Sequence, residues 1–125
     1  MKKLLLLSTI LLLSGNVYAD SDNYLCSKYR KLKVSNVDKV LAVGINRIYT
    51  DSVETYVLGY GTPIRVSISG LKLGMEHIIK RRTLVCDDEK VGQIRTYKLS
   101  GLGMRVGEFV LQSGDKKVST YIEID

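Results

Sequence analysis

Apolar and polar residues alternate along most of the chain after residue 40, and glycines separate the alternating runs. The clearest run is 64–68, in which Ile64, Val66 and Ile68 alternate with Arg65 and Ser67. A period of two predicts a strand with one buried face and one face in water. Comparable runs predict five further strands, within 33–49 and over 53–58, 93–99, 105–112 and 117–124.

Two of these runs carry additional signals. Ser113-Gly-Asp115 separates the last two runs and predicts a hairpin turn. The segment 33–49 also fits helical spacing through Val37, Val40 and Ile48, so a helix from Asn36 is the alternative. Gly44 and the many β-branched residues favour a strand instead.

Residues 69–89 have a different period. Met75, Ile78, Ile79, Arg82 and Val85 follow one another at helical spacing, which predicts a helix. A strand from His77 to Cys86 is the alternative, but the adjacent pair 78–79 and the basic run 80–82 interrupt its alternation. A short helical turn near the start of residues 20–30 is also expected, with Asp22 or Asn23 as its cap.

The expected order is therefore a short helix, three strands, one helix and three strands. Six mostly antiparallel strands in a domain of this size must close or stack to protect their edges. The sequence thus predicts a mainly β (α+β) fold, a small six-stranded barrel of the oligonucleotide/oligosaccharide-binding (OB) type with one helix between two three-strand groups. The alternative is a β-sandwich with a disulfide between its sheets.

The first residues predict export. Lys2 and Lys3 precede an apolar run over 4–13, and residues 14–19 are small or polar and end in Ala19. This is the layout of a cleavable signal peptide, and the run is shorter than the roughly 20 residues of a membrane-spanning helix. We therefore expect a signal peptide over 1–19, a single small β-rich domain over 20–125 without a transmembrane segment, and a secreted or periplasmic location.

The chain has two cysteines, Cys26 and Cys86. Cysteines of exported proteins usually pair, so the sequence predicts a Cys26–Cys86 disulfide. Two cysteines and one histidine cannot complete a tetrahedral zinc site, so no metal site and no other cofactor is expected.

The charge of the chain suggests its partners. The formal net charge is +6, and losing Lys2 and Lys3 with the signal would lower it by two. Outside the cytosol, basic clusters are expected to meet acidic glycans, anionic envelope components or acidic proteins rather than nucleic acid. The candidate binding residues are the basic side chains Lys28, Arg30, Lys31, Lys80, Arg81 and Arg82.

Tyrosines add a second kind of candidate. Tyr56 and Tyr60 flank Gly59 and are expected to form an exposed pair, since tyrosine offers an apolar face and a polar tip to sugars and proteins. Catalysis is not expected, because His77 is the only histidine and Asp87, Asp88 and Glu89 are adjacent rather than opposed.

A short N-terminal segment resembles a known family. Cys26-Ser-Lys-Tyr-Arg30, followed by Asp38-Lys39-Val40-Leu41, resembles the N-terminus of the B subunits of heat-labile enterotoxin and cholera toxin. The resemblance implies a small barrel, a ring of five subunits lined by the central helix, and binding to cell-surface glycans. The chain departs from that family in having no Trp for sugar stacking and in placing Cys86 near the end of the expected helix.

Together these features predict an exported, non-enzymatic binding protein. One form is an oligomeric subunit that binds cell-surface glycans, similar to the toxin B subunits and pentameric if the resemblance extends to assembly. The alternative is a monomeric periplasmic inhibitor or accessory protein that binds an acidic protein or envelope partner.

Overall fold

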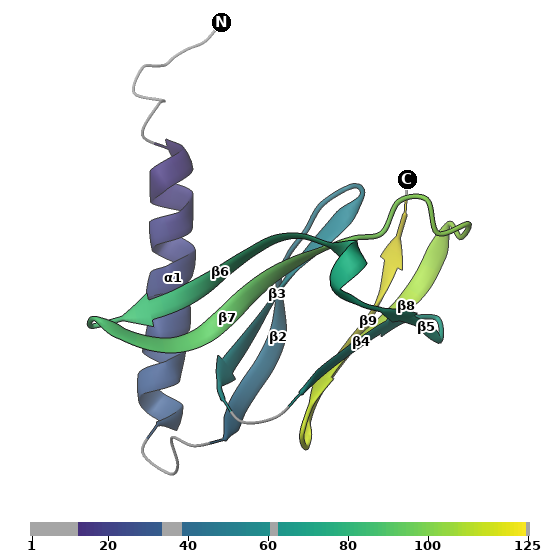
Figure 1. Ribbon diagram of the computed structural model, residues 1–125. Coiled ribbons are helices and arrows are strands. Elements are labelled where there is room, and N and C mark those ends of the chain that lie inside the picture. Colours follow the sequence, from purple (N-terminus) through teal and green to yellow (C-terminus); the bar gives the residue numbers. More distant parts are fainter. Residues whose placement is uncertain (1–12, 34–38, 61–62, 125) are drawn as a thin grey trace, which may run out of the picture.

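In the described part of the chain, one α-helix and two antiparallel sheets of four strands make up the fold (Figure 1). The structure is a computed structural model, and it describes residues 13–33, 39–60 and 63–124. The first sheet has the strand order β2-β3-β7-β6, with β2 (Val40–Ile48), β3 (Ser52–Gly59), β7 (Glu89–Lys98) and β6 (Ile78–Cys86). The second sheet has the order β5-β4-β8-β9, with β5 (Leu71–Leu73), β4 (Ile64–Ile68), β8 (Val106–Ser113) and β9 (Lys116–Glu123).

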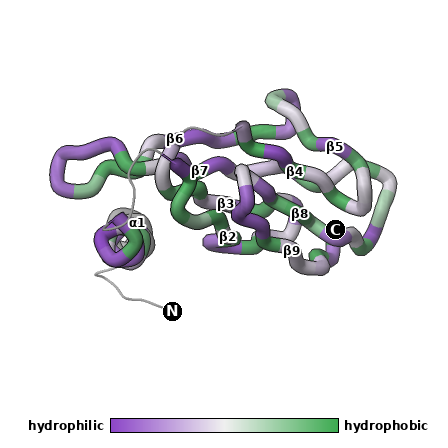
Figure 2. Tube along the Cα trace, turned by 90° about the horizontal axis from the view of Figure 1, so that it is seen from below, coloured by the Kyte–Doolittle hydropathy of each residue, from purple (hydrophilic) through white to green (hydrophobic). Residues whose placement is uncertain are grey.

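The first sheet is covered on both faces. The helix α1 (Leu13–Leu32) packs on one face, where Leu25 and Tyr29 join a buried cluster with Leu84 and Ile94. The second sheet packs on the other face, around Phe109 and other apolar residues. Figure 2 shows α1 beside the first sheet and away from the second. As a result all eight residues of β3 are buried, because α1 and the second sheet enclose this strand.

Most of the predicted strands are confirmed. The segment 33–49 contains strand β2, and the alternating run 64–68 is β4. The hairpin of β8 and β9 turns at Gly114, whose φ of 63° is easily adopted by glycine. The mainly β (α+β) fold class is therefore correct.

The predicted six-stranded barrel is wrong. The described strands form two separate sheets, and β2 contacts β9 without pairing with it. The β-sandwich alternative placed the disulfide between the two sheets, and this placement is also wrong. The Cys26–Cys86 bond joins α1 to the first sheet.

The helix predicted within 69–89 is also wrong. This segment forms β5, a 3-10 turn η2 (Met75–His77) and strand β6. The pairing of β6 with β7 has register shifts between Ile78 and Lys80 and between Leu84 and Val85. The first shift adds Ile79 to β6, whereas the second adds Val91 to β7. Only the first interrupts the period of two along β6, and this interruption lets the segment fit helical spacing.

The helix α1 is longer than the expected turn and begins at Leu13, inside the predicted signal peptide. Residues 1–12 of that signal lie outside the described residues, and the expected cleavage after Ala19 would shorten α1. Cleavage itself stays a prediction. Within the described residues, no helix is long and apolar enough to cross a membrane.

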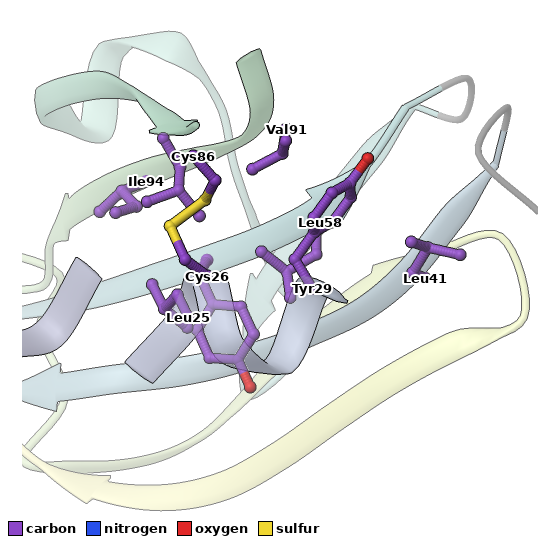
Figure 3. Packing of buried hydrophobic residues seen from close by; sticks show 10 residues of the cluster. Leu25, Cys26, Tyr29, Leu41, Leu58, Cys86, Val91 and Ile94 are labelled. Atoms are coloured by element: carbon purple, nitrogen blue, oxygen red, sulfur yellow. A yellow bond between two sulfur atoms is a disulfide. The ribbon is translucent and has the colours of Figure 1, made fainter. Parts of the chain in front are cut away.

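The predicted disulfide is confirmed. Cys26 on α1 and Cys86 at the end of β6 are bonded across 60 positions of sequence, and both are buried (Figure 3). The bond lies within the apolar cluster that Leu25, Tyr29 and Ile94 share, so it fixes α1 where its apolar face already packs.

Replacing both cysteines by alanine should lower the free energy of unfolding by about 4 kcal/mol, because the closed loop is long. Urea titration of the wild type and of Cys26→Ala/Cys86→Ala would measure this difference. The control is the wild type in dithiothreitol, which should have the same free energy of unfolding as the variant. A loss below about 1 kcal/mol would mean that apolar packing alone holds α1.

Candidate functional site

Three of the candidate cations attach α1 to the first sheet. Arg82 donates two hydrogen bonds of 2.9 Å to the carboxylate oxygens of Asp22. Arg30 donates to Asp87 at 3.2 Å. Lys28 donates from Nζ to the hydroxyl of Tyr56 at 2.9 Å, and Nζ lies 5.4 Å from the centre of that ring. These side chains connect sequence-distant elements, which gives them a structural role.

Tyr56 is not an exposed partner of Tyr60. Its side chain is 6% exposed and belongs to the buried cluster under α1. A Cβ on Gly44 would collide with the ring and hydroxyl of Tyr56, so a glycine at position 44 makes room for the phenol. The hydrogen bond to Tyr56 raises the pKa of Lys28 above its ordinary value, an effect that burial of the amine partly offsets. The expectation of an exposed pair is therefore wrong, since only Tyr60 is accessible, at 41% exposure.

Another group of candidates surrounds a pocket at the β6–β7 hairpin. This basic pocket has a volume of about 320 Å³ and is lined by Tyr60, Arg81, Arg82, Thr83, Lys90, Gly92 and Gln93. The strand register pairs Arg81 with Arg95, Thr83 with Gln93 and Val85 with Lys90. Since Leu84 and Ile94 face α1, the alternation of the strands places Arg81 and Thr83 on the opposite face of the sheet.

The electrostatics of the basic pocket favour an anion. Arg81 and Lys90 contribute two positive charges, the third cation of the lining, Arg82, is paired with Asp22, and none of the described lining residues carries a carboxylate. Oε1 of Gln93 accepts a hydrogen bond of 3.0 Å from Nε of Arg95, so the amide nitrogen of Gln93 is the atom that can serve a ligand. Hydroxyls of Tyr60 and Thr83 are further donors. The pocket can therefore bind a carboxylate, sulfate or phosphate through charge-assisted hydrogen bonds.

The surroundings of the basic pocket are partly apolar. Ile79 and Val85 on β6 are 56% and 50% exposed. β6 is also an edge strand, and among the described strands only β7 pairs with it. Arginine and tyrosine, both present in the lining, are enriched at protein–protein interfaces.

The remaining candidates do not join this pocket. Lys31 on α1 and Lys80 on β6 are exposed. His77 accepts a hydrogen bond at Nδ1 from the backbone amide of Gly74 at 3.2 Å, which places it in the turn before β6. No three metal-ligating side chains come together within the described parts of the chain.

The sequence reasoning missed Thr83, Lys90 and Gln93. The turn at Asp87 and Asp88, both with positive φ, brings Lys90 and Gln93 alongside β6. Interpreting 77–86 as a strand, the alternative that was set aside, would have placed Arg81 and Thr83 on one face. The missed signal was therefore the period of two along β6, which is regular only after the bulge at Ile79.

No model of a protein family matches the chain, and a search of curated proteins finds no significant match.

The Asp22–Arg82 pair should contribute more to stability than the exposed Arg30–Asp87 pair. The side chains of Asp22 and Arg82 are 31% and 25% exposed, whereas those of Arg30 and Asp87 are 55% and 75% exposed. A double-mutant cycle with Asp22→Asn and Arg82→Gln, followed by urea unfolding, should give a coupling of about 1–2 kcal/mol. The matched cycle with Arg30→Gln and Asp87→Asn should stay below about 0.5 kcal/mol. Equal couplings would contradict this assignment.

Tyr60 should ionise above the ordinary tyrosine pKa of about 10. Burial raises its pKa, and the charges of Tyr29 and Glu89 add to the effect. Neutral Tyr60 makes its full contribution to the free energy of unfolding at a pH below the pKa of this residue in the unfolded chain. This contribution is lost as the pH rises through the pKa of Tyr60 in the folded protein. NMR titration of the tyrosine Cζ signals, assigned with Tyr60→Phe, would measure the shift, and Glu89→Gln should reduce it. A Tyr60 pKa below the ordinary value would contradict this account.

Proposed function

We propose that the protein is an exported, non-enzymatic binding protein that holds an acidic segment of a protein partner at the basic pocket. The observation that supports this proposal most directly is the lining of the pocket. This lining contains the cations Arg81 and Lys90 and the neutral hydrogen-bonding side chains of Tyr60, Thr83 and Gln93. None of the described lining residues carries a carboxylate.

Export is supported by two features. The disulfide fits an extracytoplasmic protein, because such bonds persist in oxidising compartments. The layout of residues 1–19 is that of a signal peptide. A secreted or periplasmic location is therefore part of the proposal.

A protein partner is favoured over a glycan at this pocket by the strand edge beside it. An extended segment could pair with the outer side of β6, where Ile79 and Val85 offer aliphatic contacts. An acidic side chain of that segment would then lie over Arg81 and Thr83, which share one face of the strand.

The proposal is for a monomer. The toxin B-subunit resemblance implies a ring lined by a helix between two groups of strands. The segment expected to supply that helix is β5, η2 and β6. A toxin-like ring would need a helix where this chain has strands, whereas a monomeric inhibitor or accessory protein does not. We therefore prefer the monomer hypothesis.

The test uses the oxidised protein and two synthetic peptides. One peptide alternates Glu with Val, and its control has Gln at each Glu position. The acidic peptide should bind, more weakly at high salt, and Arg81→Gln or Lys90→Gln should each weaken binding about tenfold. Lys98→Gln, which removes an exposed charge from β7 outside the pocket, is the matched control and should have little effect.

Two outcomes would contradict the proposal. One is equal binding of the acidic and neutral peptides, and the other is an equal loss in Arg81→Gln and Lys98→Gln. Sedimentation of the same protein should show a monomer, and a stable ring would favour the toxin-like assembly instead.

A further inference from the structure

The outer face of the second sheet carries a polar surface. This surface contains none of the binding residues that the sequence predicted. Val66 and Ile68 of β4 and Phe109 and Leu111 of β8 are buried in the core. The alternation of a strand therefore directs Arg65, Ser67, Val110 and Gln112 away from the core. The register pairs Arg65 with Gln112 and Ser67 with Val110, so the four form one block on adjacent strands.

This block lies over two adjoining hollows. The larger has a volume of about 370 Å³, and Lys72 of β5 completes its rim beside Ser67, with which it is paired. The smaller has a volume of about 170 Å³ and is lined by Pro63, Arg65, Gln112 and Gly114. Both hollows are lined by Arg65 and Gln112, so they adjoin across β4 and β8, and we name the two together the outer groove.

The outer groove is positively charged. Arg65 and Lys72 are exposed, and Lys117 of β9 is paired with Gln112 and continues the same row. None of the described residues that line either hollow carries a carboxylate. Glu108 and Glu123 on this face are further along β8 and β9, beyond Val110 and Tyr121. The charge therefore favours an anionic ligand at the end that contains Arg65.

The other lining groups favour a hydroxyl-rich ligand. Ser67 can donate and accept a hydrogen bond. The Nε2 atom of Gln112 donates to the carbonyl of Gly114 at 3.3 Å, so Oε1 is the atom that can accept from a ligand hydroxyl. The apolar part of the lining, on which the carbon face of a sugar ring could pack, consists of Ile64, Val66, Leu73 and the half-buried Val110. The exposed aliphatic residues that mark the β6 edge are absent from the described lining of the outer groove.

We propose that the outer groove binds an acidic oligosaccharide. One acidic sugar unit occupies the larger hollow with its carboxylate or sulfate between Arg65 and Lys72. The next unit extends over Arg65 and Gln112 into the smaller hollow. A chain of repeating units suits two hollows in series, and a volume of 370 Å³ lies in the range of ordinary ligand pockets. This site lies on the second sheet, so it does not depend on the basic pocket of the first.

The experiment titrates the oxidised protein with three probes while amide shifts are followed by NMR. The probes are an oligogalacturonate hexasaccharide, a neutral maltohexaose and inorganic phosphate. The acidic hexasaccharide should bind and shift amides of β4, β5 and β8. Arg65→Gln and Lys72→Gln should each weaken it about tenfold, since charge-assisted hydrogen bonds are lost. Lys98→Gln is the control and should bind it as the wild type does, whereas Arg81→Gln tests whether the hexasaccharide binds at the basic pocket instead.

Each alternative result overturns the proposal. Equal binding of maltohexaose would show that charge has no role. Binding of phosphate as tight as that of the hexasaccharide would assign the groove to a simple anion. An equal loss in all four variants would indicate a general charge effect. A loss in Arg81→Gln equal to that in Arg65→Gln would assign the hexasaccharide to the basic pocket instead.

Discussion

The packing of α1 on the first sheet is the contact on which the rest of the structure depends. The second sheet covers only one face of the first, so the other face would leave Leu58, Leu84 and Ile94 in water without α1. Burial of apolar side chains stabilises the packing of α1 on the sheet, and the Cys26–Cys86 bond keeps α1 covalently attached to β6. A small domain buries a limited share of its surface, which makes such a covalent link valuable.

This contact also separates the basic residues into two groups. Lys28, Arg30 and Arg82 are engaged by Tyr56, Asp87 and Asp22, so their charges hold α1 in place. Arg81 and Lys90 lie on the opposite face of the same hairpin, around the basic pocket. Adjacent residues such as Arg81 and Arg82 thus have different roles, because neighbours in a strand point to opposite faces.

The two proposed sites use cations in different surroundings. The basic pocket lies beside an edge strand with exposed Ile79 and Val85, which suits a protein segment. The outer groove has Ser67 beside Lys72 and Gln112 beside Arg65, which suits a hydrated sugar chain. A basic chain thus offers two chemically distinct surfaces, although its sequence shows only scattered Lys and Arg.

The sequence by itself determined the regular strands, the mainly β class and the disulfide. Alternation over 64–68 and the Ser113-Gly-Asp115 turn are local signals, and two cysteines admit one intramolecular pairing. Only the tertiary structure decided that β6 is a strand, because the bulge at Ile79 interrupts the alternation at its start. It also decided that the sheets stay separate, that Tyr56 is buried, and that Thr83, Lys90 and Gln93 meet Arg81. Strand partners and register arise from contacts between distant segments, and a pattern read along one chain does not contain them.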